Sequence, residues 1–230
     1  MKWGVVSFPG SLDDGDAVYA LREVLGQDAI RLWHKDEDLQ GADCVLLPGG
    51  FSYGDYLRCG AIARFSPIMQ SIARFAADGG LVIGTCNGFQ ILCEAHLLPG
   101  VLTRNRSLSF VCDQVVVRVE NARSRFTCGA QLGELLHLPI KHGEGRYVAP
   151  ESEIRQMEER GQILLRYVDA NGVETDEANP NGSLHGIAGV ANDRFNVFGL
   201  MPHPEHAVEK TLVGGDDGLK LFRSVIESAR

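Results

Sequence analysis

The sequence lacks any apolar run long enough to span a bilayer. The longest such runs, Cys44–Leu47 and Leu81–Ile83, are only a few residues long, whereas a membrane helix needs about 20 apolar residues. The stretch Met1–Phe8 has one basic residue and neither the apolar core nor the cleavage site of a secretion signal. We therefore expect a cytoplasmic protein with no membrane partner, in which this stretch forms the first β-strand.

Positive charge is also scarce. The 230 residues include 22 Lys and Arg against 30 Asp and Glu, which gives a formal net charge of -8, and the pI is about 5.4. An acidic surface repels phosphate groups, which argues against nucleic acid as a partner. The hydrophobic share of 44% is that of an ordinary globular protein. No repeat or linker divides the chain, so we predict one domain over residues 1–230.

Motifs for metal and nucleotide binding are missing. The six cysteines form no C-x-x-C pair, so we interpret them as reduced thiols and expect no metal site. His203 and His206 lack the helical H-E-x-x-H spacing of a zinc site. The chain contains neither a phosphate-binding loop, G-x-x-x-x-G-K-S/T, nor a strand-linked G-x-G-x-x-G. We therefore expect no cofactor in this chain.

The order of apolar segments indicates an α/β fold. Near-continuous apolar strands that alternate with helices are typical of a parallel sheet covered on both faces. Asp13 and Asp14 are well placed to cap the first predicted helix. Strands are predicted near residues 2–8, 29–33, 43–47 and 81–85, and helices over residues 13–25 and 68–77 and after residue 86.

The second half of the chain has more β character. Asn171-Gly172, which follows a strand-like run, predicts a β-hairpin. We therefore expect an open, mostly parallel, flavodoxin-like sheet with a β-rich insertion in the second half. The strands predicted in this half are 111–119, 164–168 and 195–200, and the helices are 150–160 and 216–229.

Cys86 lies where an apolar strand runs into a helix, in the segment GLVIGTCNGFQIL. Gly84 and Gly88 flank it, as a sharp strand-to-helix turn requires. A thiol at a helix N-terminus feels the positive end of the helix dipole, which favours the nucleophilic thiolate. A lone cysteine after an apolar strand is more often a core residue, and this setting shifts the balance toward a nucleophile.

His203 is the candidate base for that thiol. Pro204 disfavours helix for the residue before it, so His203 and Glu205 are predicted to project on one side of an extended segment. A carboxylate beside an imidazole fixes its tautomer and stabilises the imidazolium. Taken alone, the segment is explained slightly better by a surface turn in which the glutamate is unrelated to the histidine.

A nucleophilic cysteine also needs donors for the oxyanion that it creates. The predicted turn places the Asn87 N–H next to the thiol. The turn Pro48-Gly49-Gly50, at the end of a predicted parallel strand, could supply a second N–H from Gly50. Ligands of open α/β sheets bind beyond the carboxyl ends of the strands, where both turns would lie.

Taken together, these motifs resemble those of the class I, or triad, glutamine amidotransferases. The resemblance rests on Gly84-x-Cys86-x-Gly88-x-Gln90, on the Pro48-Gly49-Gly50 turn and on His203-x-Glu205. One departure is visible: the first loop reads Leu12-Asp13-Asp14 where the family usually has Asn-Cys-Asp. Further matching stretches, which extend the resemblance over nearly the whole chain, are 47–61, 142–145 and 179–183.

The resemblance implies a mechanism and an assembly. Cys86 would attack the side-chain amide of glutamine, and His203, oriented by Glu205, would move the protons. Ammonia would pass to a synthetase subunit that uses ATP and magnesium, in a complex that also holds a small accessory subunit. The N–H groups of Gly50 and Asn87 would hold the oxyanion, and the substrate contacts would be Gly49, Gly50, Gln90, Ser107, Leu108 and Phe110.

Two other functions remain open from the sequence. Another elbow-cysteine hydrolase, such as a peptidase or a γ-glutamyl hydrolase, could share this architecture. A non-catalytic docking subunit could retain the fold, although the intact Cys86, His203 and Glu205 argue against it. His142, within His142-Gly143-Glu144-Gly145, is a rival base. Its loose, glycine-rich setting favours a structural or docking role.

Overall fold

The computed structural model describes residues 1–211 and 215–229. Within these residues a nine-stranded sheet has the strand order β2-β1-β3-β4-β11-β10-β9-β6-β7. Neighbours from β2 to β11 pair in parallel, and neighbours from β11 to β7 pair antiparallel. The parallel half consists of β1 (Lys2–Ser7), β2 (Asp28–Trp33), β3 (Cys44–Leu47), β4 (Leu81–Thr85) and β11 (Val197–Leu200).

The antiparallel half is the predicted β-rich insertion. It comes from the chain between β4 and β11, and it extends the main sheet instead of forming a separate layer. A small second sheet pairs β5 (Val101–Thr103) with β8 (Arg146–Val148). The strands that extend the main sheet are β6 (Val111–Val119), β7 (Leu135–His142), β9 (Ile163–Val168) and β10 (Ile187–Ala191).

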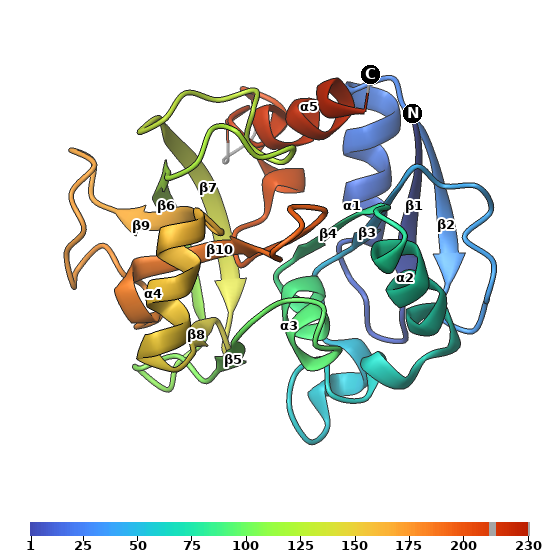
Figure 1. Ribbon diagram of the computed structural model, residues 1–230, viewed down its shortest axis with the longest axis horizontal. Coiled ribbons are helices and arrows are strands. Elements are labelled where there is room, and N and C mark those ends of the chain that lie inside the picture. The colour runs from blue at the N-terminus through green and yellow to red at the C-terminus, as the bar shows by residue number, and fades with distance from the viewer. Residues whose placement is uncertain (212–214, 230) are drawn as a thin grey trace.

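Helices cover both faces of the sheet, as the sequence predicts. Side chains of β1 alternate between the two faces: Trp3 and Val5 belong to the core cluster that includes α1 and α5, and Val6 belongs to the cluster that includes α2, α3 and α4. Figure 1 shows α1 and α5 in the upper part of the view and α2 and α3 in the lower part. The helices are α1 (Asp14–Tyr19), continued by a π-helical turn (Ala20–Val24), α2 (Pro67–Ala77), α3 (Asn87–Glu94), α4 (Glu151–Arg160) and α5 (Gly218–Ser228), with short 3₁₀ turns at Ser52–Asp55, Ala63–Phe65, Leu184–Gly186 and Pro204–His206.

Two local predictions are wrong. The Asp13 side chain makes no capping hydrogen bond to α1, because its carboxylate forms ion pairs with side chains far away in sequence. Asn171-Gly172 does form a tight turn, in which the Gly172 N–H donates to the Asp169 carbonyl at 3.0 Å. The turn does not lead into a partner strand, since β9 pairs instead with β10, which starts at Ile187.

None of the helices in the part of the chain that the structure describes is long and apolar enough to cross a membrane.

Candidate active site

Cys86 occupies a strained turn between β4 and α3. Its φ of +49° and ψ of -105° lie in a region that side chains rarely adopt, and its N–H donates to the Leu200 carbonyl of β11 at 2.8 Å. A Cβ on Gly88 would lie 1.9 Å from the Leu47 carbonyl oxygen, and a Cβ on Gly84 would lie 2.6 Å from the Gly88 carbonyl carbon. Both glycines are therefore needed for α3 to start this close to the sheet, as the elbow prediction requires.

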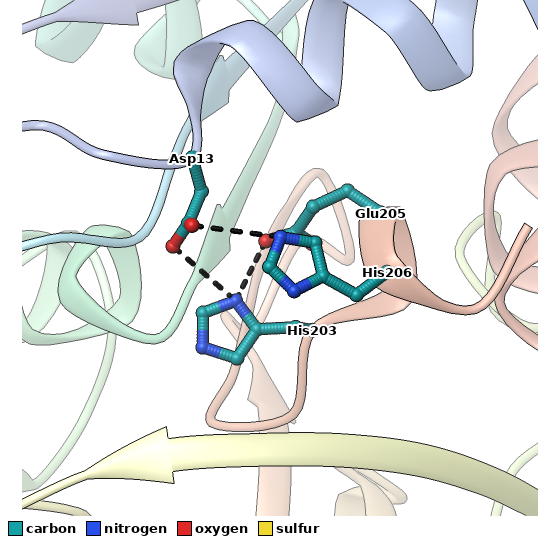
Figure 2. Close-up of side chains that lie close together, drawn as sticks. All are labelled: Asp13, His203, Glu205 and His206. Atoms are coloured by element: carbon teal, nitrogen blue, oxygen red, sulfur yellow. Dashed lines mark hydrogen bonds and ion pairs between the residues drawn. The ribbon is translucent and has the colours of Figure 1, made fainter. Parts of the chain in front are cut away.

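His203 and Glu205 form a buried pair behind the elbow. The Nδ1–H of His203 donates to Glu205 Oε1 at 2.7 Å, and Thr85 Oγ1 lies 3.4 Å from the same carboxylate oxygen. His203 is fully buried, and Glu205 is 2% exposed. The predicted extended segment does not form: His203 (φ -108°, ψ 87°) precedes a 3₁₀ turn, and Glu205 belongs to that turn. The two side chains still meet, as Figure 2 shows.

The surroundings of His203 favour its charged form. Burial alone would lower the pKa of the imidazole, but the negative charges of Glu205 and of the Cys86 thiolate outweigh it and raise the pKa to about 10. The other ring nitrogen, Nε2, is buried and has no hydrogen-bond partner among the described residues. An imidazolium beside a thiolate is the arrangement that activates a cysteine nucleophile.

The Gly49-Gly50 turn lies against this pair. Gly50 (φ +139°) forms an isolated antiparallel β-bridge with Ser11. Its hydrogen bonds run from the Leu12 N–H to the Gly49 carbonyl and from the Phe51 N–H to the Gly10 carbonyl, so the Gly50 N–H takes no part in the bridge. A Cβ on Gly49 would lie 2.6 Å from His203 Cε1, so the turn must be glycine to pack on the ring. Both predicted oxyanion donors therefore lie in segments next to Cys86 and His203.

The α3 helix is tied to this turn through a side chain. The Ser52 N–H donates to Asn87 Oδ1 at 3.2 Å, and Asn87 Nδ2 donates to Gln90 Oε1 at 2.8 Å. The Asn87 N–H itself belongs to the first turn of α3, where backbone donors have no partner within the helix. The side chain of Asn87 thus fixes the position of the Gly49-Gly50 turn relative to the backbone N–H of Asn87.

A cavity of about 270 Å³ opens at Cys86. Of the residues predicted to contact substrate, Gly50, Gln90, Leu108 and Phe110 line it, whereas Gly49 and Ser107 are not among its lining residues. The Gln90 side-chain amide donates to the Glu144 carbonyl at 2.6 Å. Ser109, in the segment expected to border the substrate, lines the cavity too, and the sequence does not predict the other lining residues as substrate contacts: Phe51, Asp55, Cys59, Arg104, Lys141, His142, Gly143 and Glu144.

His142 lies in the cavity wall as a neutral ring. Burial, with a smaller contribution from the charge of His203, lowers the pKa of His142 to about 4. Its Nδ1–H donates to Asn105 Oδ1 at 3.2 Å, and Nε2 faces Asn181 Nδ2 at 3.5 Å, so one neutral tautomer satisfies both contacts. With both nitrogens held by amides, His142 is placed to shape the wall rather than to move protons.

The side chain that sequence reasoning missed is Asp13. It is 2% exposed, and its carboxylate lies 3.5 Å from His203 Nδ1, 2.5 Å from Lys141 Nζ and 3.5 Å from His206 Nε2. The sequence predicts a helix cap at Asp13-Asp14, and only the unusual sequence of the first loop marks the position. Nothing local links residue 13 to residues 141 and 203.

Asp13, His203, Glu205 and His206 present ligand-type atoms within 4.8 Å of one another. Figure 2 shows the two carboxylates turned toward the two rings. Three basic groups already face these carboxylates: Lys141 and His206 at Asp13, and His203 at both Asp13 and Glu205. The set is therefore explained as an ion-pair network around His203.

Comparison with known proteins identifies the family of the chain. Residues 4–219 match the family of CobB/CobQ-like glutamine amidotransferase domains. The chain is 57% identical to subunit PurQ of phosphoribosylformylglycinamidine synthase from Salinibacter ruber and 56% identical to the same subunit from Thermomicrobium roseum, and each alignment covers 98% of this chain and 95% of the relative. A solved structure of PurLQS from Thermotoga maritima is similar with a TM-score of 0.88 and 43% identity, covering 100% of this chain and 99% of that chain.

Proposed function

The chain belongs to the CobB/CobQ-like glutamine amidotransferase family, and from this premise we propose that it is the glutaminase subunit of phosphoribosylformylglycinamidine synthase. In this role it hydrolyses glutamine to glutamate. The ammonia serves the ATP-dependent conversion of formylglycinamide ribonucleotide to formylglycinamidine ribonucleotide in purine biosynthesis.

One observation carries the proposed chemistry. Cys86, on a strained strand-to-helix turn, lies at the rim of a cavity with the buried His203–Glu205 pair beside it. The sulfur is the group that reaches the cavity, while His203 and Glu205 are closed off from solvent. Nucleophilic catalysis on an amide requires this arrangement, in which an accessible nucleophile lies beside a base that a carboxylate orients.

In the mechanism, the Cys86 thiolate attacks the side-chain amide carbon of glutamine. The carbonyl oxygen becomes an oxyanion, which the N–H groups of Gly50 and Asn87 stabilise. The His203 imidazolium gives its Nε2 proton to the leaving nitrogen, so ammonia departs and a thioester remains. His203 then takes a proton from water, hydroxide attacks the thioester, and glutamate and the thiolate–imidazolium pair are regenerated. Glu205 holds the Nδ1–H throughout.

The cavity also suits the charged end of free glutamine. Its wall carries the cations Arg104 and Lys141 and the anions Asp55 and Glu144, and Arg104 Nε lies 3.7 Å from Glu144 Oε1. A zwitterionic α-amino acid needs one partner of each sign. A residue within a peptide has neither charge, so this wall favours glutamine over a peptide substrate.

The remaining chemistry is assigned to partners. A PurL-type synthetase subunit would bind ATP and magnesium and use the ammonia, and a PurS-type accessory subunit would complete the complex. The similarity to PurLQS supports this assembly. The proposed location is the cytoplasm, which suits six cysteines that are all free thiols.

Replacing the nucleophile in the assembled complex tests the proposal. In Cys86→Ala, glutamine-dependent synthesis should fall to background, while synthesis from added ammonium salt should stay at the wild-type rate. Loss of both activities would contradict the division of labour, and retention of the glutamine-dependent activity would contradict the role of Cys86. Incubating the wild-type complex with a γ-glutamyl peptide should release no product, which separates this function from a γ-glutamyl hydrolase.

A further inference from the structure

Asp13 is a buried carboxylate that the mechanism above does not use. It directly precedes α1, near the opposite end of the sequence from His203, yet its Oδ2 lies 3.5 Å from His203 Nδ1. Its backbone N–H donates to the Gly49 carbonyl at 3.3 Å. A Cβ on Gly49 would lie 2.3 Å from Asp13 Oδ2, so the glycine turn leaves room for this carboxylate against the ring.

His203 Nδ1 is thus flanked by two carboxylates at different distances. Glu205 at 2.7 Å takes the hydrogen bond, and Asp13 at 3.5 Å is too far to share it with good geometry. The ion pairs with His206 and Lys141, and the nearby charge of His203, overcome the effect of burial and keep the pKa of Asp13 well below its usual range. Asp13 therefore acts on the imidazole as a fixed negative charge.

Lys141 links Asp13 to the nucleophile. Its Nζ contacts Asp13 Oδ1 at 2.5 Å, and its backbone carbonyl accepts a long contact of 3.7 Å from Cys86 Sγ. Both atoms belong to Lys141, the next-to-last residue of β7. The end of this strand therefore contacts the sulfur and also partly neutralises the carboxylate beside the base. His206 Nε2 lies 3.5 Å from the same Asp13 oxygen.

We propose that Asp13 is a second positioning carboxylate for His203, which stabilises its imidazolium form together with Glu205, and that Lys141 sets how strongly Asp13 acts. This inference rests on the proposed function, because it assigns a role within the same thiolate–imidazolium pair. The charged and titratable groups that face His203 and Asp13 are Cys86 from the turn before α3, Glu205 and His206 from the turn after β11, and Lys141 and His142 from β7.

The first test is Asp13→Asn, which keeps the shape of the side chain and removes its charge. The pKa of His203, followed by NMR of ring-labelled histidine in the full chain and assigned by loss of the signal in His203→Gln, should fall by about one unit. The alkaline limb of glutamine-dependent kcat in the assembled complex should move down by the same amount. One unit corresponds to about a tenfold loss of activity on that limb, with little change in KM.

Asp14→Asn is the matched control. Asp14 is the next residue and the first of α1, but its carboxylate accepts from Ser7 Oγ and pairs with Arg31, not with His203. This variant should leave the His203 titration and the pH profile unchanged. A shift of less than about 0.3 unit in Asp13→Asn, or an equal shift in Asp14→Asn, would overturn the proposal.

Lys141→Met supplies a test in the opposite direction. Removing the ammonium leaves the Asp13 charge less neutralised, so the pKa of His203 should rise. If the Asp13–Lys141 pair had a purely structural role, Asp13→Asn and Lys141→Met would shift the pKa of His203 in the same direction. The NMR titration is read on the uncomplexed chain, so it stands even if Lys141→Met weakens glutamine binding. Failure of the Cys86→Ala test would refute the proposed function, whereas an unmoved His203 titration would refute only the role of Asp13.

Discussion

At the scale of single residues, the site depends on keeping a charged imidazole inside the protein. Burial works against the charge on His203, and the nearby negative groups overcome it. The two carboxylates are not equivalent, because only Glu205 is within hydrogen-bond distance of Nδ1. Glu205 fixes both the tautomer and the orientation of the ring, whereas Asp13 contributes charge.

This difference predicts the outcome of Glu205→Gln. The amide can still accept from Nδ1–H, but it no longer carries the charge that stabilises the imidazolium, and it can turn its NH₂ toward the ring instead. We expect glutamine-dependent kcat to fall by about 100-fold or more, with KM nearly unchanged, and the loss should exceed that of Asp13→Asn. Steady-state kinetics of both variants in the complex would show this order, and a larger loss for Asp13→Asn would contradict it.

The residues that sequence reasoning found are those with local signals. Cys86 lies between two glycines at a strand-to-helix boundary, and His203 and Glu205 are two positions apart in a proline-framed segment. Asp13 has no such signal, because its partners come from β7 and from the turn after β11. A carboxylate at a helix start is explained equally well as a cap, and only the folded chain separates the two.

At the scale of elements, the elbow depends on how closely α3 approaches β3. Gly88 is the second residue of α3, and an added Cβ would lie 1.9 Å from the backbone oxygen of Leu47. The atom that the added Cβ would meet is a backbone atom and not the end of a flexible side chain, so it cannot move aside easily. The helix start would have to move away from the sheet, and it would take Cys86 and the Asn87 N–H with it.

Gly88→Ala should therefore lower both stability and activity. We expect a loss of about 1–3 kcal/mol in the free energy of unfolding, the range of overpacked sites, measured by urea denaturation, with glutaminase activity falling at least tenfold. Gly15→Ala is the matched control, because Gly15 is the second residue of α1 and a Cβ there meets only the end of Arg31 at 3.2 Å. That variant should be neutral or slightly stabilised. Equal effects in the two would contradict the steric argument.

The strands of the parallel half of the sheet can be predicted from the sequence. For the antiparallel half, the sequence predicts β-strands but not how they pair. Strands such as β3 and β4 are buried on both faces and read as continuous apolar runs. β9 and β10 are distant in sequence, and their pairing contains register shifts. The Asn171-Gly172 turn lies between them but closes no hairpin, because β9 is an interior strand that pairs with β10 and β6 and not with the residues that directly follow the turn.

At the scale of the whole molecule, exposed apolar side chains surround the mouth of the cavity. Phe51, Leu108 and Phe110 line the opening with exposed fractions of 42%, 79% and 54%. Tyr56 and Leu57, at 74% and 90%, lie in the same loop as the lining residues Asp55 and Cys59. We call these five residues the mouth patch. Side chains of this kind are typical of an interface, and a subunit that covered them would receive ammonia where it forms.

The mouth patch predicts that Leu108→Asp weakens assembly of the complex. Burying a carboxylate against a partner costs free energy unless it is paired, so we expect the Kd for the synthetase subunits to rise at least tenfold. The measurement is binding of the variant to the synthetase subunits without glutamine, because Leu108 also lines the cavity. Leu132→Asp, at 73% exposure and outside the cavity wall, is the control and should bind normally. Equal weakening in both variants, or none in Leu108→Asp, would place the docking face elsewhere.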